Sequence, residues 1–194
     1  MKARIRLGIS TLGLILAAAT AMPAQGAVTV IGGGLARSCY EAVEFESVSA
    51  QRGIEICDLA LEQESLRRRD KAATLTNRGI LYMRAGKNQR AVTDYERSLS
   101  LMPELLETKV NLGAALYGLG RYTDALAALN EGILTDDVDA RAAGFYNRAL
   151  AHESLGDIQS AYEDFRRALN ARPDFALAEK QLSRFTVQTI DESS

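Results

Sequence analysis

The sequence predicts an all-α protein in which antiparallel helix hairpins stack in an array, and two repeated patterns support this prediction. A motif with Asn first and a small residue third occurs at Asn77-Arg78-Gly79, Asn111-Leu112-Gly113 and Asn147-Arg148-Ala149, at intervals of 34 and 36 residues. About twelve residues later come a small residue and, four positions on, a large apolar one, at Ala91 and Tyr95, Ala125 and Leu129, and Ala161 and Phe165. A period of about 34 residues with such positions is typical of stacked helical hairpins, which bury their apolar faces only against neighbouring units.

Residues 1–26 have the pattern of a secretory signal peptide. Basic residues at Lys2, Arg4 and Arg6 precede an apolar run over 7–19, shorter than the about 20 residues that span a bilayer. Small residues then offer cleavage sites at Ala19-Thr20-Ala21 and Ala24-Gln25-Gly26. We therefore expect an exported protein, periplasmic or secreted, with no stable membrane span after cleavage; an uncleaved signal anchor is the alternative. Loss of the three basic residues changes the formal charge from −2 to −5, which argues against nucleic acid as a partner.

Residues 27–37 are expected to be a flexible leader. Its stretch Val28-Thr29-Val30-Ile31-Gly32-Gly33-Gly34 is like a strand that runs into a glycine loop, the opening of a dinucleotide-binding unit. However, Arg37 stands at the third glycine position of that motif, and the sequence that follows is helical without a second strand. We therefore expect no bound cofactor.

Residues 38–71 form a degenerate helical hairpin and linker that contain both cysteines. Cys39 corresponds to the Asn position of the first helix in a repeat, and Cys57 to the aromatic position of the second. In an oxidising compartment a Cys39–Cys57 disulfide is expected, and closing this loop of 18 residues would contribute about 3 kcal/mol. Two free thiols and a lipidated Cys39 are the alternatives.

Three clear repeats occupy residues 72–105, 106–141 and 142–173. In the first, the pattern predicts one helix over Ala73–Ala85 and another over Asn88–Leu101, because Gly86 interrupts and Pro103 ends the helical pattern. In the second, two extra residues fall within 135–139, where we expect aspartates to cap the next helix rather than to bind calcium. After the third, residues 174–194 are expected to be a capping helix, over 174–186, and a tail.

The repeats resemble the tetratricopeptide repeat family. The matching positions are Gly79, Tyr82, Ala91, Tyr95 and Pro103 in the first copy, Gly113, Leu116, Ala125 and Leu129 in the second, and Ala149, His152, Ala161, Phe165 and Pro173 in the third. Asp137 stands where the second copy would have its proline. The resemblance implies a right-handed superhelical array whose concave surface is lined by the first helix of each hairpin.

The resemblance also implies a partner-binding groove on that surface, lined by Asn77, Ile80, Met83, Arg84, Asn111, Ala114, Tyr117, Asn147, Leu150 and Glu153. We call its three asparagines, Asn77, Asn111 and Asn147, the asparagine row. An Asn side chain has both a donor and an acceptor, so the row can pair with the main chain of an extended peptide. The alternative is that these asparagines serve only local structure. The Lys and Arg clamp of relatives that bind chaperone carboxylates is absent from the neighbouring positions, so a chaperone is not expected.

The residues favour a binding protein over an enzyme. His152 is the single histidine and stands at a packing position, and the sequence has no nucleophile elbow, phosphate loop or zinc signature. We expect no catalytic residues, no metal and no cofactor. The predicted function is an exported scaffold that binds an extended segment of another envelope protein. A self-assembling structural adaptor is the alternative, an enzyme that uses His152 is a distant one, and the oligomeric state is left open.

Overall fold

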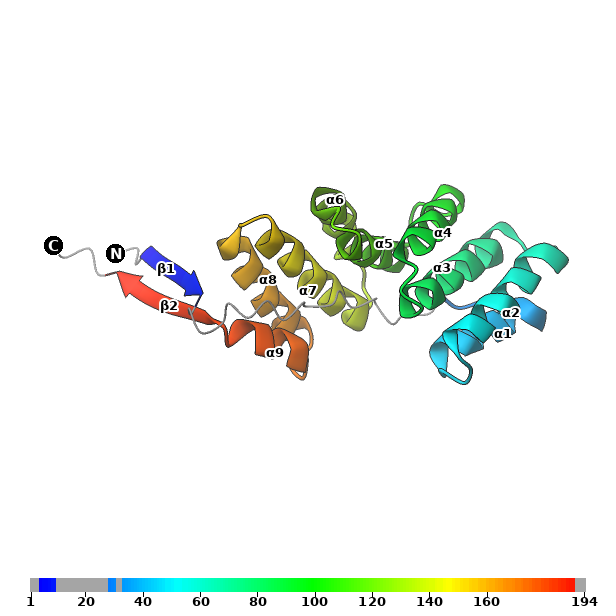
Figure 1. Ribbon diagram of the computed structural model, residues 1–194, viewed down its shortest axis with the longest axis horizontal. Helices are drawn as coiled ribbons and strands as arrows, with labels where there is room; N and C mark the ends of the chain where they lie inside the picture. Colours follow the sequence, from blue (N-terminus) through cyan, green and yellow to red (C-terminus); the bar gives the residue numbers. More distant parts are fainter. Residues whose placement is uncertain (1–3, 10–27, 31–32, 191–194) are drawn as a thin grey trace.

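The computed structural model describes residues 4–9, 28–30 and 33–190. These residues form the elements β1 (Arg4–Ile9), α1 (Gly34–Glu44), α2 (Ala50–Gln63), α3 (Arg68–Arg84), α4 (Asn88–Leu101), α5 (Leu106–Gly118), α6 (Tyr122–Gly132), α7 (Val138–Ser154), α8 (Ile158–Ala171), α9 (Ala176–Leu182) and β2 (Phe185–Ile190). Figure 1 shows the helices following one another in pairs along an elongated array. The predicted all-α array of hairpins is confirmed.

The pairs α3–α4, α5–α6 and α7–α8 correspond to the three predicted repeats. Helix α4 has the predicted bounds, whereas α3 begins at Arg68, ahead of the predicted start at Ala73. The first helix of each pair is followed by a glycine with a positive φ, of 71° at Gly86, 75° at Gly120 and 83° at Gly156. Glycine adopts this left-handed conformation without a steric penalty, so it ends the helix and turns the chain back.

Small residues let the two helices of a hairpin pack closely, as expected. A Cβ atom added to Gly79 would lie 2.4 Å from Cε1 of Tyr95, and one added to Gly113 would lie 2.4 Å from Cγ of Leu129. Both large side chains are fully buried. The space above each glycine is therefore filled by the large residue of the second helix, which explains why the two positions repeat together.

A buried ion pair joins the helices of the first and third repeats. In the first, Arg78 donates to both carboxylate oxygens of Asp94, at 2.7 Å each, and also to Asp58 of α2 at 2.6 Å. In the third, Arg148 donates to both oxygens of Asp164, at 2.6 and 2.9 Å. The second repeat has the apolar residues Leu112 and Ala128 at these positions. The same hairpin geometry is therefore built with and without the ion pair.

The first hairpin is more ordered at its start than expected. Cys39 and Cys57 form the predicted disulfide, which joins α1 to α2 with a Cα–Cα distance of 4.9 Å. Helix α1 begins at Gly34, inside the expected flexible leader, because Glu64 at the end of α2 accepts hydrogen bonds from the backbone N–H groups of Leu35 and Ala36. A carboxylate at a helix N-terminus satisfies free N–H groups and complements the helix dipole.

The end of the array differs from the expected helix over 174–186. Helix α9 ends at Leu182, and β2 begins at Phe185. The ring of Phe185 packs against Tyr162 and Phe165 of α8, with centroids 5.5 and 6.0 Å apart. This contact and the β-branched residues of Phe185–Ile190 favour an extended chain over a further helical turn.

Strand β2 pairs with β1 in antiparallel register, with Arg4 opposite Ile190 and Ile9 opposite Phe185. Strand β1 lies within the expected signal peptide, residues 1–26. The other residues of that segment lie outside the described part of the chain, so the signal peptide stays a prediction.

Candidate functional site

The first member of the asparagine row binds the main chain of a distant segment. Asn77 is fully buried in the middle of α3. Its Oδ1 accepts a hydrogen bond from the N–H of Val28 at 2.9 Å, and its Nδ2 donates to the carbonyl oxygen of the same residue at 3.0 Å. One asparagine thus satisfies both main-chain polar groups of one residue, and both hydrogen bonds are independent of that residue's side chain.

The second member has no such partner. Asn111 is fully buried in α5, and among the described residues neither its Nδ2 nor its Oδ1 has a hydrogen-bond partner. A buried polar group left unpaired costs about 1–3 kcal/mol, and native proteins contain few of them. Asn111 stands at the position where Asn77 binds a main chain, and its amide has the donor and the acceptor needed to bind one in the same way.

The third repeat contributes a buried Asn147 and a charged contact with the chain beyond α9. Glu153 of α7 forms an ion pair with Arg184, which also donates to Gln181 of α9. The described residues therefore engage predicted groove residues at both ends of the array, Asn77 through Val28 and Glu153 through Arg184. Sequence reasoning anticipated neither contact.

The other predicted groove residues are apolar side chains packed between helices, an arginine that contacts the first hairpin, and a half-buried tyrosine. Ile80, Ala114 and Leu150 are buried among the packed helices, and Met83 is half-buried beside them. Arg84 reaches the first hairpin, where it donates to the carbonyl oxygen of Val43 at 3.1 Å and lies 3.3 Å from Glu46.

Tyr117 is half-buried and packs on the ring of Tyr122, with centroids 5.5 Å apart. Burial raises the pKa of Tyr117, and a hydrogen bond with Ser154 opposes this shift only in part. Tyr117 is therefore neutral at physiological pH.

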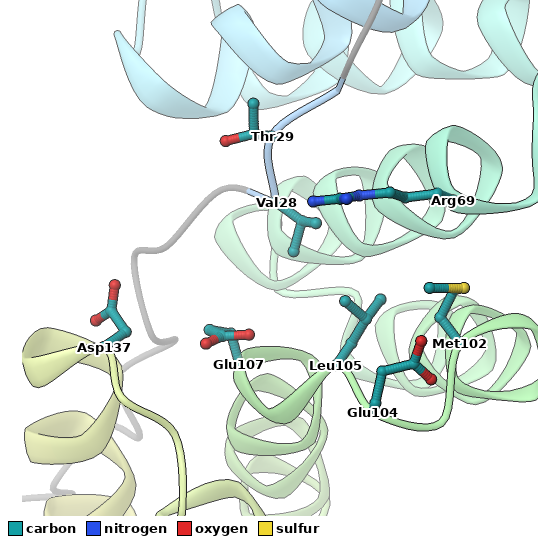
Figure 2. A pocket seen from close by; sticks show the side chains of 8 residues that line it. All are labelled: Val28, Thr29, Arg69, Met102, Glu104, Leu105, Glu107 and Asp137. Carbon is teal, nitrogen blue, oxygen red and sulfur yellow. The ribbon is translucent and has the colours of Figure 1, made fainter.

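A cavity of about 430 Å³ opens beside Val28 at the N-terminal ends of the first helices (Figure 2). It is lined by Val28, Thr29, Arg69, Met102, Glu104, Leu105, Glu107 and Asp137. Glu107 lies four residues before Asn111 on the same face of α5, so the cavity adjoins the asparagine row. Asp137 also caps α7, as expected, by accepting from the N–H of Ala140 at 2.7 Å. Acidic side chains outnumber basic ones in the lining, which disfavours an anionic ligand.

His152 lies among carboxylates of the third hairpin. Its Nδ1 is 3.5 Å from Asp157 and its Nε2 is 4.0 Å from Asp164, which already binds Arg148. Among the described residues, no group of three or more His, Cys, Asp and Glu side chains could hold a metal ion. No helix in the described part of the chain has the length and apolar character needed to cross a membrane.

Comparison with known proteins identifies the repeats. Family models of the tetratricopeptide repeat match residues 70–133 and 142–175, which together make up about half of the chain and include the asparagine row. The chain is built of tetratricopeptide repeats. Its resemblance to that family, first seen in the spacing of small and large residues, is thereby confirmed.

Relatives and solved structures agree with this assignment. The photosystem I assembly protein Ycf3 of Acaryochloris marina is 33% identical over 104 residues, 53% of this chain and 59% of that protein. The chain spans only 10% of another relative, human superkiller complex protein 3, at 25% identity. MamA of Desulfovibrio magneticus has the same fold, with a TM-score of 0.63 at 21% identity over 77% of this chain and 82% of that one.

A further solved structure contains a bound peptide. The second tetratricopeptide-repeat domain of human RPAP3, in complex with an HSP70 peptide, matches with a TM-score of 0.55 and 25% identity. The match covers 60% of this chain and 96% of that domain.

Proposed function

We propose that this chain is a scaffold that holds an extended segment of another protein along the asparagine row. The observation that carries this proposal is the pair of hydrogen bonds between Asn77 and the main chain of Val28, together with the buried and unpaired amide of Asn111 one repeat further on. The same residue type in the same position of the next hairpin can accept and donate in the same way. The solved complex of the RPAP3 domain with an HSP70 peptide supports a peptide-binding role in general.

The ligand is expected to be an internal segment of a protein chain, without the acidic side chains and C-terminal carboxylate of a chaperone peptide. The acidic side chains of Glu104, Glu107 and Asp137 line the cavity beside Val28, and of the cavity's residues Arg69 alone is cationic. An anionic ligand would be repelled there, whereas the hydrogen bonds of an extended main chain carry no charge. This argues against a chaperone-type acidic peptide and for an internal segment of a partner.

We further propose that the protein is exported and that its partner belongs to the cell envelope. The pattern of residues 1–26 and the Cys39–Cys57 disulfide both support this location, because disulfides persist in oxidising compartments.

A crosslinking pull-down from the native envelope tests the proposal. Asn111→Ala should lower partner capture about tenfold or more, because two buried hydrogen bonds of about 1 kcal/mol each are lost from the complex. Asn170→Ala is the matched control, since Asn170 is exposed on α8 away from the row. Helicity should be the same in both variants. Equal capture by the Asn111 variant and the unchanged protein would refute the proposed function.

A further inference from the structure

We propose that residues 28–30 are a built-in strap that fills the Asn77 position of the asparagine row, so that a partner is held at Asn111. This inference rests on the proposed function and goes beyond it, because it removes Asn77 from the partner's site. At the start of its site the partner then meets the main chain of the strap.

The strap is held at two points. The side chain of Val30 is 2% exposed and packs in an apolar cluster with Ala36 of α1, Ala60 of α2 and Ala73 of α3. Thr29 is exposed, and the main chain of Val28 is bound by Asn77. Alternation of a buried and an exposed side chain is the pattern of an extended chain, the same conformation that the row would require of a partner.

The strap occupies the Asn77 position more readily than a separate peptide, because it is tethered to the same chain. Val28 and Asn77 belong to one folded chain, and short tethers give effective concentrations of roughly millimolar. A partner at micromolar concentration would therefore occupy the Asn77 position roughly a thousand times less often than the strap, for equal intrinsic affinity. Asn77 is consequently a residue of the fold, and Asn111 is the first one open to a partner.

The surroundings of Asn111 agree with this assignment. The cavity beside Val28 leaves room next to the strap, one helical turn before Asn111 on α5. Farther along the row, Glu153 is already engaged by Arg184. The contacts of Asn77 and Glu153 thus frame a central section of the row, and the unpaired amide of Asn111 lies in it.

Amide hydrogen exchange of Val28, followed by NMR in the full chain without any partner, tests the strap directly. The Val28 amide should exchange at least about tenfold faster in Asn77→Ala, which removes its acceptor, and in Val30→Asp, which expels the anchor. Thr29→Asp is the matched control for the added charge, because Thr29 is exposed, and it should leave exchange slow. Asn111→Ala should also leave it slow.

A labelled peptide with the sequence of residues 27–34 supplies a second measurement. In fluorescence polarisation it should bind Val30→Asp at least about tenfold more tightly than the unchanged protein, in which the strap competes, and this gain should vanish in Val30→Asp/Asn77→Ala. Equal Val28 exchange in the unchanged protein and in Asn77→Ala, or equal binding to the unchanged protein and to Val30→Asp, would overturn the strap. Slow exchange that is lost on dilution would overturn it as well, because it would mean that a second copy donates the segment.

Capture of the partner separates this inference from the proposed function. If the strap occupies Asn77, Asn77→Ala should retain capture within about twofold, while Asn111→Ala loses it. Loss of capture in both variants would leave the function standing and refute the strap. Retention in both would refute the function, while slow exchange of Val28 would still support the strap itself.

Discussion

Arg78→Leu is a sharp test of how the hairpins tolerate buried charge, because the second repeat already carries the replacement. Arg78 and Asp94 are 14% and 4% exposed in their side chains and share two hydrogen bonds of 2.7 Å. Burial by itself lowers the pKa of Arg78, but hydrogen bonds and charge from Asp94 outweigh it, and the pKa lies above its ordinary value. The corresponding residues of the second repeat are Leu112 and Ala128.

The expected loss of stability depends on which charged groups each variant leaves buried without their partner. Arg78→Leu leaves the Asp94 carboxylate buried with Arg97 at 3.8 Å as its remaining cation, so unfolding should become easier by about 3 kcal/mol, the lower end for a broken buried pair. Asp94→Ala should cost about 2 kcal/mol, because Asp58 still binds the Arg78 side chain. The double variant recreates the apolar pair of the second repeat, and its stability should lie within about 1 kcal/mol of the unchanged protein.

Urea denaturation of the four proteins, followed by circular dichroism, measures these differences and gives the coupling between the two positions. We expect the double variant to be more stable than Arg78→Leu alone by about 2 kcal/mol. Arg148→Leu with Asp164→Ala provides the same comparison in the third repeat. If the effects of the single changes simply add in the double variant, the reasoning from a buried ion pair is wrong.

Three further predictions concern other contacts. Tyr95→Phe should leave stability unchanged or raise it by up to about 1 kcal/mol in thermal denaturation, because the buried Tyr95 hydroxyl has no hydrogen-bond partner in the described part of the chain. Phe165 fills the same position in the third repeat, and a clear loss of stability would contradict this prediction. Replacing both Cys39 and Cys57 by Ala should lower the stability measured in urea by about 3 kcal/mol, and reductant should do the same to the unchanged protein. Hydrogen bonds from the side chain and backbone of Ser160 lower the pKa of Asp157, so the contribution of Asp157 to stability is present above its unfolded pKa and is lost as the pH falls below about 4. In acid titrations Asp157→Asn should therefore lose less stability in this pH range than the unchanged protein does. Identical titration curves would contradict this prediction.

Much of the fold could be predicted from the sequence because hairpin packing is local. Gly79 and Tyr95 lie in one hairpin and recur as Gly113 and Leu129, so the need for a small residue opposite a large one is visible as a period. Cys39 was placed correctly for the same reason, since it lies in a helix that pairs with the next helix along the chain. The prediction failed where the chain leaves this period, at the start of α1 and after Leu182.

The candidate site was predictable in its residue types and not in its occupancy. The asparagine row was visible as a repeated Asn, but the bond between Asn77 and Val28 joins residues 49 positions apart. Because it uses only main-chain groups of Val28, no side chain records it in the sequence. The β-branched run Val28-Thr29-Val30 does indicate extended structure. The main-chain N–H and C=O groups of such a segment need hydrogen-bond partners, and this requirement is the one sign of the contact that the sequence contains.

The sequence by itself determined the repeat and the close packing within each hairpin, because these depend on spacing between neighbouring helices. Only the tertiary structure decided which asparagine is already bound and which is buried without a partner. It likewise decided that Arg184 covers Glu153 at the far end of the row. Such contacts depend on where segments outside the repeat come to lie, and the free energy of main-chain hydrogen bonds is the same for almost any residue that supplies them.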